Sequence, residues 1–280
     1  MITVREALYR GASLLEKSET PFLDASIILS HILDISKEKL FASYPDPVDP
    51  GLMERYLEAM EKRKKNVPVA YITNKKEFFG LTFYVDERVL SPRPDTETLV
   101  ETALEIVGKN PKVKKILDMC TGSGCIGISL KSSLPELAIT CSDISPDAVD
   151  VCRYNSNRLL SKPVVIQISD LFEKITGEFD MIVSNPPYVP AAEVKAIRES
   201  SPAEPQLALD GGDDGLDLIR EIIPASLEHL TPRGYLLLES SIEQTYSIER
   251  MMKKAGYTDI ETRMDLTGRN RVTVGRKPLA

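Results

Sequence analysis

A glycine-containing loop and a later carboxylate form the first group of residues that could bind a ligand. The loop covers 118–124 with the sequence DMCTGSG, and Asp143 follows in the next predicted strand. Glycines let the backbone turn tightly and approach a ligand that a side chain would block. A carboxylate about 20 residues further on reaches ribose hydroxyls in a doubly wound sheet. The loop lacks both the G-x-G-x-x-G order and the lysine of a P-loop, so the spacing predicts an adenosine group without a pyrophosphate.

A second acidic group ends another predicted strand. Asp170 and Leu171 stand within the sequence SDLF at 169–172. An acid beside apolar side chains could hold the edge and face of an adenine ring. By itself this signal is weak, because an aspartate that ends a strand is commonly a turn residue.

The third group is the sequence NPPY at 185–188, directly after the apolar run FDMIVS. Strand carboxyl ends form the ligand crevice of an α/β sheet, so this loop should face the glycine loop. Pro186 and Pro187 stiffen the backbone and remove two N–H donors, which leaves carbonyl acceptors. Asn185 adds a side-chain acceptor and Tyr188 an aromatic plane. Together these residues predict a site for a substrate that carries an NH₂ group.

The elements that must position these groups alternate between strand and helix from residue 113 onward. Alternation of this kind predicts an α/β fold with an open, mostly parallel sheet covered by helices on both faces. The predicted strands cover 113–119, 137–143, 164–169, 179–184, 235–240, 257–264 and 271–275, and the predicted helices cover 125–133, 145–160, 214–230 and 241–255.

The first 74 residues instead predict short amphipathic helices. Thr3 with Glu6 predicts a capping box, and Thr20 and Asp49, each followed by proline, predict two further helix starts. Such helices must bury their apolar stripes against one another, which predicts a small helical bundle. Strand-like residues around Gly80 then predict a β-hairpin. The expected domains are a bundle over 1–74, a hairpin linker over 75–93 and an α/β domain over 94–280.

Composition narrows the class of protein further. The 280 residues carry a net charge of −7, which argues against non-specific nucleic-acid binding. The sequence has neither an apolar run long enough to span a membrane nor a signal-peptide pattern, so it predicts a cytoplasmic protein. Its four cysteines are close together and lack metal-site spacing, and only His31 and His229 are histidines. We expect reduced thiols and no metal.

The motifs together resemble the release factor glutamine methyltransferases (the HemK/PrmC family of protein-(glutamine-N5) methyltransferases) over almost the whole chain. The most specific feature of this resemblance is the segment LSPRPDTE at 90–97 together with the predicted helical N-terminal domain. Cys120 stands where the family commonly has glycine, and Ser91, Ser240 and Ser241 also depart from its usual residues. Further matching segments are PVAYI at 68–72, FGL at 79–81, EP at 204–205, AL at 208–209, DGGDDGL at 210–216, LE at 238–239, Gln244 and DLTGR at 265–269.

The resemblance implies a Rossmann-like domain with a seven-stranded sheet that uses S-adenosyl-L-methionine and no metal. Its substrate would be the glutamine of the Gly-Gly-Gln motif in class 1 peptide chain release factors, docked by the bundle. Asn185, Pro186, Pro187 and Tyr188 would bind that glutamine; Asn185, Pro186 and Tyr188 would be catalytic, and Asn185 would also touch the cofactor. The cofactor's methionine part would contact Cys120, Thr121, Gly122, Ser123 and Gly124, its ribose Asp143, and its adenine Asp170 and Leu171.

Alternatives remain open at this point. The protein could methylate a glutamine of a ribosomal protein, or it could be an adenine-N6 DNA methyltransferase, because the NPPY motif is shared with those enzymes. The acidic charge and the lack of a DNA-recognition domain disfavour DNA. A release-factor-binding adaptor without activity is disfavoured by the intact Asn185–Tyr188 and Asp143 motifs. The sequence predicts a monomer and leaves the roles of Arg93 and Glu97 open between ligand contact and an ion pair.

Overall fold

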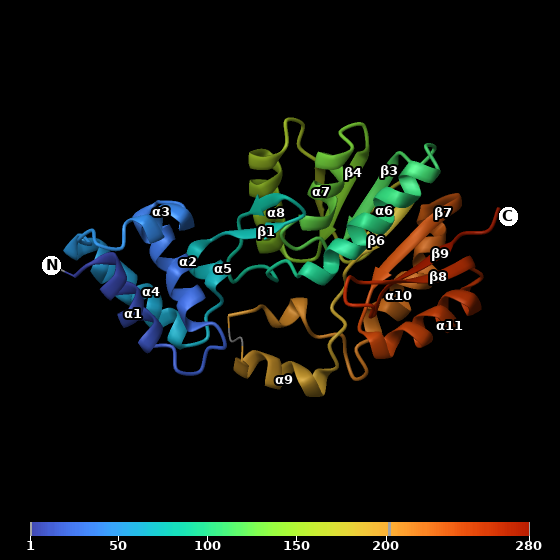
Figure 1. Cartoon of the computed structure of the whole chain (residues 1–280). Helices are drawn as coiled ribbons and strands as arrows, with labels where there is room; N and C mark the ends of the chain where they lie inside the picture. Colours follow the sequence, from blue (N-terminus) through green and yellow to red (C-terminus); the bar gives the residue numbers. More distant parts are fainter. Residues whose placement is uncertain (1, 201–202, 280) are drawn as a thin grey trace. The chain divides into compact units, whose positions relative to one another are not determined.

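The computed structural model describes residues 2–200 and 203–279, which divide into two compact units (Figure 1). The first unit holds the residues up to Lys75 and the described part of 197–203. The second holds 76–196 and the described part of 204–280, and it contains all three groups of predicted ligand-binding residues.

The first unit is a bundle of short helices: α1 (Val4–Ser13), α2 (Pro21–Leu33), α3 (Lys37–Ala42), α4 (Pro50–Lys64) and α5 (Val69–Thr73). The capping box of Thr3 and Glu6 is confirmed, and Asp49 caps α4 as predicted. Thr20 is the N-cap of α2, and the predicted helix start is confirmed; its side chain makes no capping bond to the helix, because its hydroxyl donates to Asp24. The apolar faces of these helices meet in one core around Leu8, Ile28 and Tyr56.

The second unit opens with the predicted hairpin. Strands β1 (Lys76–Phe78) and β2 (Leu81–Phe83) pair antiparallel. The turn between them needs positive φ at both of its residues, Phe79 at 49° and Gly80 at 73°. Glu97 fixes the turn, because its carboxylate accepts the Phe79 N–H at 2.8 Å.

A seven-stranded sheet forms the centre of this unit, in the order β5-β4-β3-β6-β7-β9-β8. Strands β5, β4, β3, β6 and β7 run parallel, whereas β9 and β8 are antiparallel additions at one edge. This confirms the predicted α/β architecture. The bounds are β3 Lys115–Met119, β4 Ala138–Asp143, β5 Val165–Ile168, β6 Phe179–Ser184, β7 Leu230–Glu239, β8 Thr258–Met264 and β9 Asn270–Arg276.

Helices cover both faces of the sheet (Figure 1). Leu117 and Met119 of β3 pack against α10 and α11, while Asp118, at the intervening position, contacts α7. Two of the helices, α6 and α9, lie outside the predicted ones. The bounds are α6 Glu97–Lys109, α7 Cys125–Ser133, α8 Pro146–Leu159, α9 Ala191–Ser200, α10 Asp217–His229 and α11 Thr245–Ala255.

Close packing of α7 on the sheet depends on Gly127. A Cβ atom there would lie 2.5 Å from the Cys141 Sγ atom and 3.0 Å from the Asp118 Oδ2 atom. Contacts this short force the neighbouring side chains to move. Gly108 of α6 offers a contrast, because a Cβ atom added there would meet nothing within 4 Å.

We therefore expect Gly127→Ala to lower the free energy of unfolding by about 1–3 kcal/mol through overpacking. The matched variant Gly108→Ala should raise it by up to about 1 kcal/mol, since alanine restricts the unfolded chain. Urea unfolding followed by circular dichroism measures both. Equal effects of the two substitutions would contradict the packing of α7 described above.

Candidate functional site

The register of the parallel strands brings the predicted site residues to one edge of the sheet. Met119 pairs with Ser142 on one side and with Ser184 on the other, and Ser184 pairs with Leu238. The residue that follows each of these four therefore emerges at the same edge. Those residues are Cys120, Asp143, Asn185 and Glu239.

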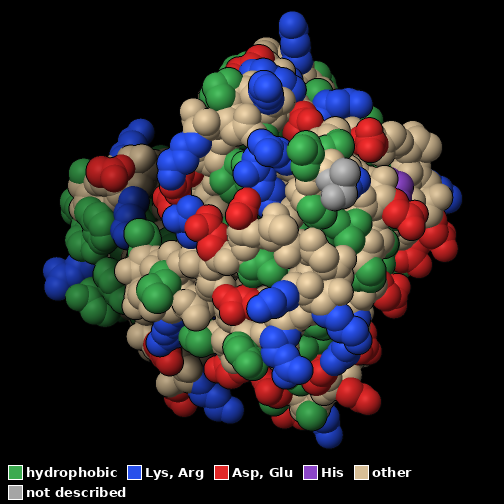
Figure 2. All heavy atoms as spheres, turned by 90° about the vertical axis from the view of Figure 1, so that its right-hand side faces the viewer, with side chains coloured by type: hydrophobic (Ala, Val, Ile, Leu, Met, Phe, Trp, Pro, Cys, Tyr) green, Lys and Arg blue, Asp and Glu red, His purple; other side chains and the backbone are tan. Residues whose placement is uncertain are grey.

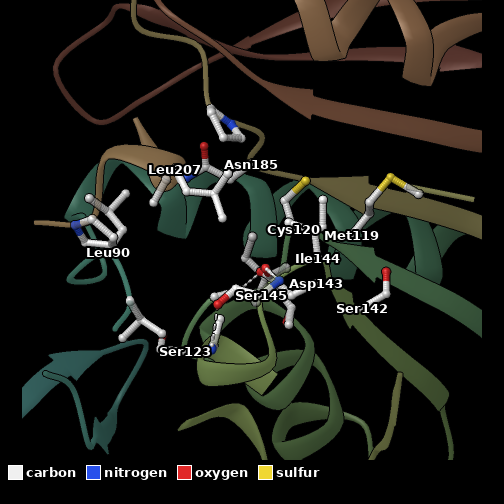
Figure 3. Close-up of a pocket in the computed structure, with 18 of the residues that line it drawn as sticks. Leu90, Met119, Cys120, Ser123, Ser142, Asp143, Ile144, Ser145, Asn185 and Leu207 are labelled. Carbon is white, nitrogen blue, oxygen red and sulfur yellow. Dashed lines mark hydrogen bonds between the residues drawn. The ribbon is translucent and has the colours of Figure 1, made fainter. Parts of the chain in front are cut away.

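A pocket opens at this edge of the second unit (Figure 3). Its walls come from the glycine loop, the ends of β4 and β5, the loop after β6 and two segments near residues 90 and 207. Of the predicted site residues, it is lined by Cys120, Thr121, Gly122, Ser123, Asp143, Asp170, Leu171, Asn185 and Pro187.

The glycine loop turns as its composition predicts. Gly124, at φ 83°, precedes α7 as its N-cap, and it supports the loop without lining the pocket. The Thr121 hydroxyl donates to the buried Asp118 carboxylate at 2.5 Å. Cys120 has φ 57°, a left-handed conformation that favours glycine. This explains physically why a glycine would suit the position.

Asp143 fixes the floor of the pocket. Its Oδ2 atom accepts the Gly122 N–H at 2.9 Å and its Oδ1 atom accepts the Ser145 N–H at 3.0 Å. Burial raises the pKa of this carboxyl, against the lowering effect of the backbone N–H groups. A carboxylate has about four lone-pair directions, so it keeps acceptor capacity for a ligand's hydroxyl group.

The wall after β5 differs in part from the prediction. Asp170 and Leu171 line the pocket, but Phe172 stacks on His229 with ring centroids 4.6 Å apart and packs into the core. The apolar surface comes instead from Ile144, a half-exposed side chain directly after Asp143. The sequence signal for Ile144 was its position directly after Asp143.

The NPPY residues divide between the pocket and its support. Asn185 and Pro187 line the pocket, whereas Pro186 is buried and Tyr188 points away to Glu239. The Asn185 Nδ2 group donates to the Thr96 hydroxyl at 3.2 Å, so its Oδ1 atom remains available as an acceptor. The Tyr188 carbonyl accepts the Gln244 Nε2 group at 2.8 Å, which anchors the end of the loop.

Several further lining residues come from two segments near residues 90 and 207. Arg93 is one for which the sequence left ligand contact open; the others were not among the predicted ligand contacts: Leu90, Pro92, Thr96, Pro205, Leu207 and Ala208. Arg93 pairs with the buried carboxylate of Glu204 at 2.5 Å, which joins the two segments. Arg93 thus both lines the pocket and forms an ion pair, while Glu97 binds the hairpin turn.

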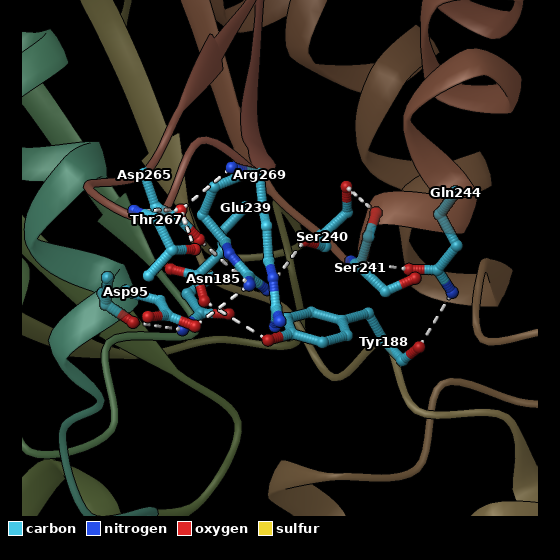
Figure 4. Close-up of polar contacts among 12 residues, drawn as sticks. Asp95, Asn185, Tyr188, Glu239, Ser240, Ser241, Gln244, Asp265, Thr267 and Arg269 are labelled. Atoms are coloured by element: carbon cyan, nitrogen blue, oxygen red, sulfur yellow. Dashed lines mark hydrogen bonds and ion pairs between the residues drawn. The ribbon is translucent and has the colours of Figure 1, made fainter.

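A buried carboxylate, Glu239, lies beside the Tyr188 hydroxyl (Figure 4). Glu239 is 1% exposed and accepts a hydrogen bond from the Tyr188 hydroxyl at 3.3 Å. Burial raises its pKa to about 7, opposed by the nearby Thr96 side chain, the Arg271 charge and the Tyr188 hydroxyl. Arg271 is held by Asp95 at 2.9 Å and Asp265 at 3.3 Å.

Surface and metal-binding features add little to this picture. Within 2–200 and 203–279, no group of three or more histidine, cysteine or carboxylate side chains could hold a metal ion. None of the helices described is both long and apolar enough to cross a membrane. Acidic and basic side chains are interspersed over the face shown in Figure 2.

The fold of the second unit is that of a methyltransferase. A methyltransferase from Pyrococcus furiosus matches with a TM-score of 0.53 at 16% identity, over 82% of this chain and 100% of that one. The T. thermophilus 16S rRNA N2 G1207 methyltransferase, solved with AdoMet and guanosine, also has a TM-score of 0.53, at 20% identity over 72% of this chain and 49% of that one. Residues 95–200 match the family model described as "Methyltransferase small domain".

Closer relatives define the family. Residues 6–73 match the "PrmC N-terminal domain" model. The release factor glutamine methyltransferase of Clostridium acetobutylicum is 38% identical over 97% of both chains. The enzyme of the same name from Koribacter versatilis is 37% identical over 99% of both chains. The one from Salmonella typhimurium is 35% identical over 96% of this chain and 97% of the other. The chain belongs to the release factor glutamine methyltransferase family.

The raised pKa of Glu239 predicts a pH dependence of stability. The ordinary pKa of this carboxyl is 4.5, and the folded protein raises it to about 7. At a pH between these two values, the folded protein holds a proton on Glu239 that the unfolded chain has lost. Its contribution to the free energy of unfolding therefore falls as pH rises through that window. Glu239→Gln should remove this part of the slope, as measured by urea unfolding at pH 5, 6 and 7. The same slope in both proteins would contradict the assignment; Asp118, also raised to about 7, is unchanged in the comparison.

Proposed function

We propose that this protein transfers the methyl group of S-adenosyl-L-methionine to the side-chain nitrogen (N5) of the glutamine in the Gly-Gly-Gln motif of class 1 peptide chain release factors. One observation carries the proposal: the Asn185 amide turns its NH₂ toward Thr96 and leaves its carbonyl as an acceptor beside the glycine loop. The names of the full-length relatives support the choice of substrate.

The pocket fits the cofactor. Asp143 would accept the ribose hydroxyls, and Asp170 and Leu171, which line the same pocket, would contact an adenine ring. Residues 120–124 would hold the methionine part, with Gly124 acting through the turn. When bound, the cofactor supplies an activated methyl group on a sulfonium, and its leaving group is neutral and needs no acid.

The protein's task is then to orient a poor nucleophile. An amide nitrogen has its lone pair delocalised into the carbonyl. The Asn185 Oδ1 atom and the Pro186 carbonyl would accept the two N–H groups of the substrate amide and aim the nitrogen at the methyl group. Positioning of this kind can lower a barrier by roughly 7–11 kcal/mol without a general base. As the bond from nitrogen to methyl forms, the bond from sulfur to methyl breaks, and the methylated nitrogen then releases one of its two protons to solvent water. Tyr188 supports the loop from behind through its hydroxyl.

The bundle would supply specificity. A Gly-Gly-Gln loop offers little surface for recognition, so we propose that residues 1–74 dock the release factor, with 75–93 as linker and 94–280 as the transferase domain. We place the protein in the cytoplasm, as a monomer without nucleic-acid or membrane partners.

A chain of residues 75–280 should bind cofactor and methylate a short Gly-Gly-Gln peptide, but lose activity on the whole factor. Equal rates of both chains on the whole factor would refute the docking role.

The role of Asn185 can be tested directly. Asn185→Ala should slow methyl transfer by about 100-fold or more, because the substrate amide becomes free to rotate, and cofactor affinity should change little. Asn185→Asp should resemble Ala, since the carboxylate cannot donate to Thr96 as the amide does. Single-turnover rates at saturating release factor measure the effect, and isothermal titration measures cofactor binding.

Asn157→Ala, an exposed asparagine of α8, is the matched control and should keep the normal rate. Near-normal turnover in both Asn185 variants would remove that residue from the mechanism. High activity of Asn185→Asp together with low activity of Asn185→Ala would show that only the acceptor oxygen of Asn185 matters.

A further inference from the structure

The segment 209–216, with the sequence LDGGDDGL, pairs through its backbone with the loop after β6. Val189 is the residue that follows the NPPY motif. Its N–H donates to the Leu209 carbonyl at 2.9 Å, and its carbonyl accepts the Gly211 N–H at 2.9 Å. These two bonds form a short parallel bridge. The segment is therefore a direct partner of the loop, although the proposed function has not yet given it a role.

Two glycines of this segment let the two backbones come close together. A Cβ atom at Gly215 would lie 2.1 Å from the Tyr188 carbonyl oxygen. A Cβ atom at Gly211 would lie 2.8 Å from the Pro187 carbonyl oxygen. The atoms approached are backbone atoms, which cannot move aside as the end of a flexible side chain can. A side chain at Gly215 would therefore have to shift one of the two backbones.

Gln244 joins the same loop from a third segment, the 3₁₀ turn Ile242–Gln244. Its Nε2 group donates to the Tyr188 carbonyl at 2.8 Å (Figure 4) and to the Asp214 carbonyl at 3.1 Å. Its Oε1 atom accepts the Ser241 N–H at 3.1 Å. Backbone carbonyls only accept and a backbone N–H only donates, so these partners fix which end of the buried amide faces the loop.

The prolines of the NPPY motif make this external support necessary. Pro186 and Pro187 have no N–H group, so the loop cannot be held there by backbone donors. Its backbone is held directly afterwards, at Tyr188 and Val189. The proposed function assigns the Pro186 carbonyl to an N–H group of the substrate, and this carbonyl lies two residues before the Gln244 contact. Because proline fixes φ, a displacement at Tyr188 moves that carbonyl as well.

We propose that Gln244 and Gly215 are positioning residues, which hold the backbone after the two prolines so that the Pro186 carbonyl stays in place as an acceptor for the substrate amide. Neither residue lines the pocket, so both act through the loop after β6. The inference rests on the proposed function, because that function gives the Pro186 carbonyl its substrate.

The first test is Gln244→Met in the full-length protein. Methionine keeps the length of the side chain but removes the amide that donates to the two carbonyls. At saturating release factor and cofactor, the single-turnover rate of methyl transfer to a purified class 1 release factor should fall by about 10- to 100-fold. Cofactor affinity and the release-factor concentration at half-saturation should change little. A merely structural role would lower the melting temperature and leave the saturated rate unchanged.

The second test compares Gly215→Ala with Gly177→Ala as its matched control. Both glycines have positive φ, at 76° and 83°, so alanine strains both backbones alike. A Cβ atom at Gly177 meets nothing within 4 Å, whereas one at Gly215 meets the Tyr188 carbonyl. The saturated rate should therefore fall by about tenfold or more in Gly215→Ala and stay normal in Gly177→Ala.

Three results would overturn the proposal: a normal saturated rate in Gln244→Met, equal rates in the two glycine variants, or a loss of cofactor affinity in Gln244→Met that matches its loss of rate. If Gly215→Ala does not fold, Gln244→Met decides alone. If instead the wild-type protein fails to methylate the release factor, the proposed function fails, which is a different result.

Discussion

Everything at the site depends on the register of four parallel strands. Because Met119, Ser142, Ser184 and Leu238 lie side by side, the next residue of each strand emerges at one edge. The buried Ser184 hydroxyl, which donates to the Met119 carbonyl at 2.8 Å, ties the two central strand ends together. A slip of one residue in any strand would reverse the direction of its side chains and would separate Cys120 and Asp143 from Asn185.

Two carboxylates near this edge are buried, although burial of a charged group costs free energy. Glu239 and Asp118 are buried carboxylates with pKa values raised to about 7, and neither would persist in a core selected for stability alone. Asp118 is used to fix the glycine loop through Thr121 and the start of α7 through Gly127. Glu239 is used to fix the loop after β6. The two carboxylates thus hold the two walls between which a methyl group would move.

The sequence predicted the strands and the glycine turns well, because both leave local signals: apolar runs of strand length, and residues that tolerate positive φ. It predicted Asn185 and Asp143 because topology places strand ends together. Helix α6 shows an amphipathic pattern but no side-chain N-cap, and it follows a proline-rich segment that reads as a linker. The contacts of Thr96, Glu239 and Arg271 could not be predicted, since they join residues whose proximity exists only after the sheet and its antiparallel edge have formed.

The most direct measurement is mass spectrometry of possible substrates after incubation with the purified protein and S-adenosyl-L-methionine. A class 1 release factor, ribosomal proteins and adenine-containing DNA should be offered in parallel, followed by peptide mapping. We predict one added methyl group on the release factor, located on the glutamine of the Gly-Gly-Gln motif, and none on the other substrates. Methylation of DNA or of a ribosomal protein with an unmodified release factor would contradict the proposed function.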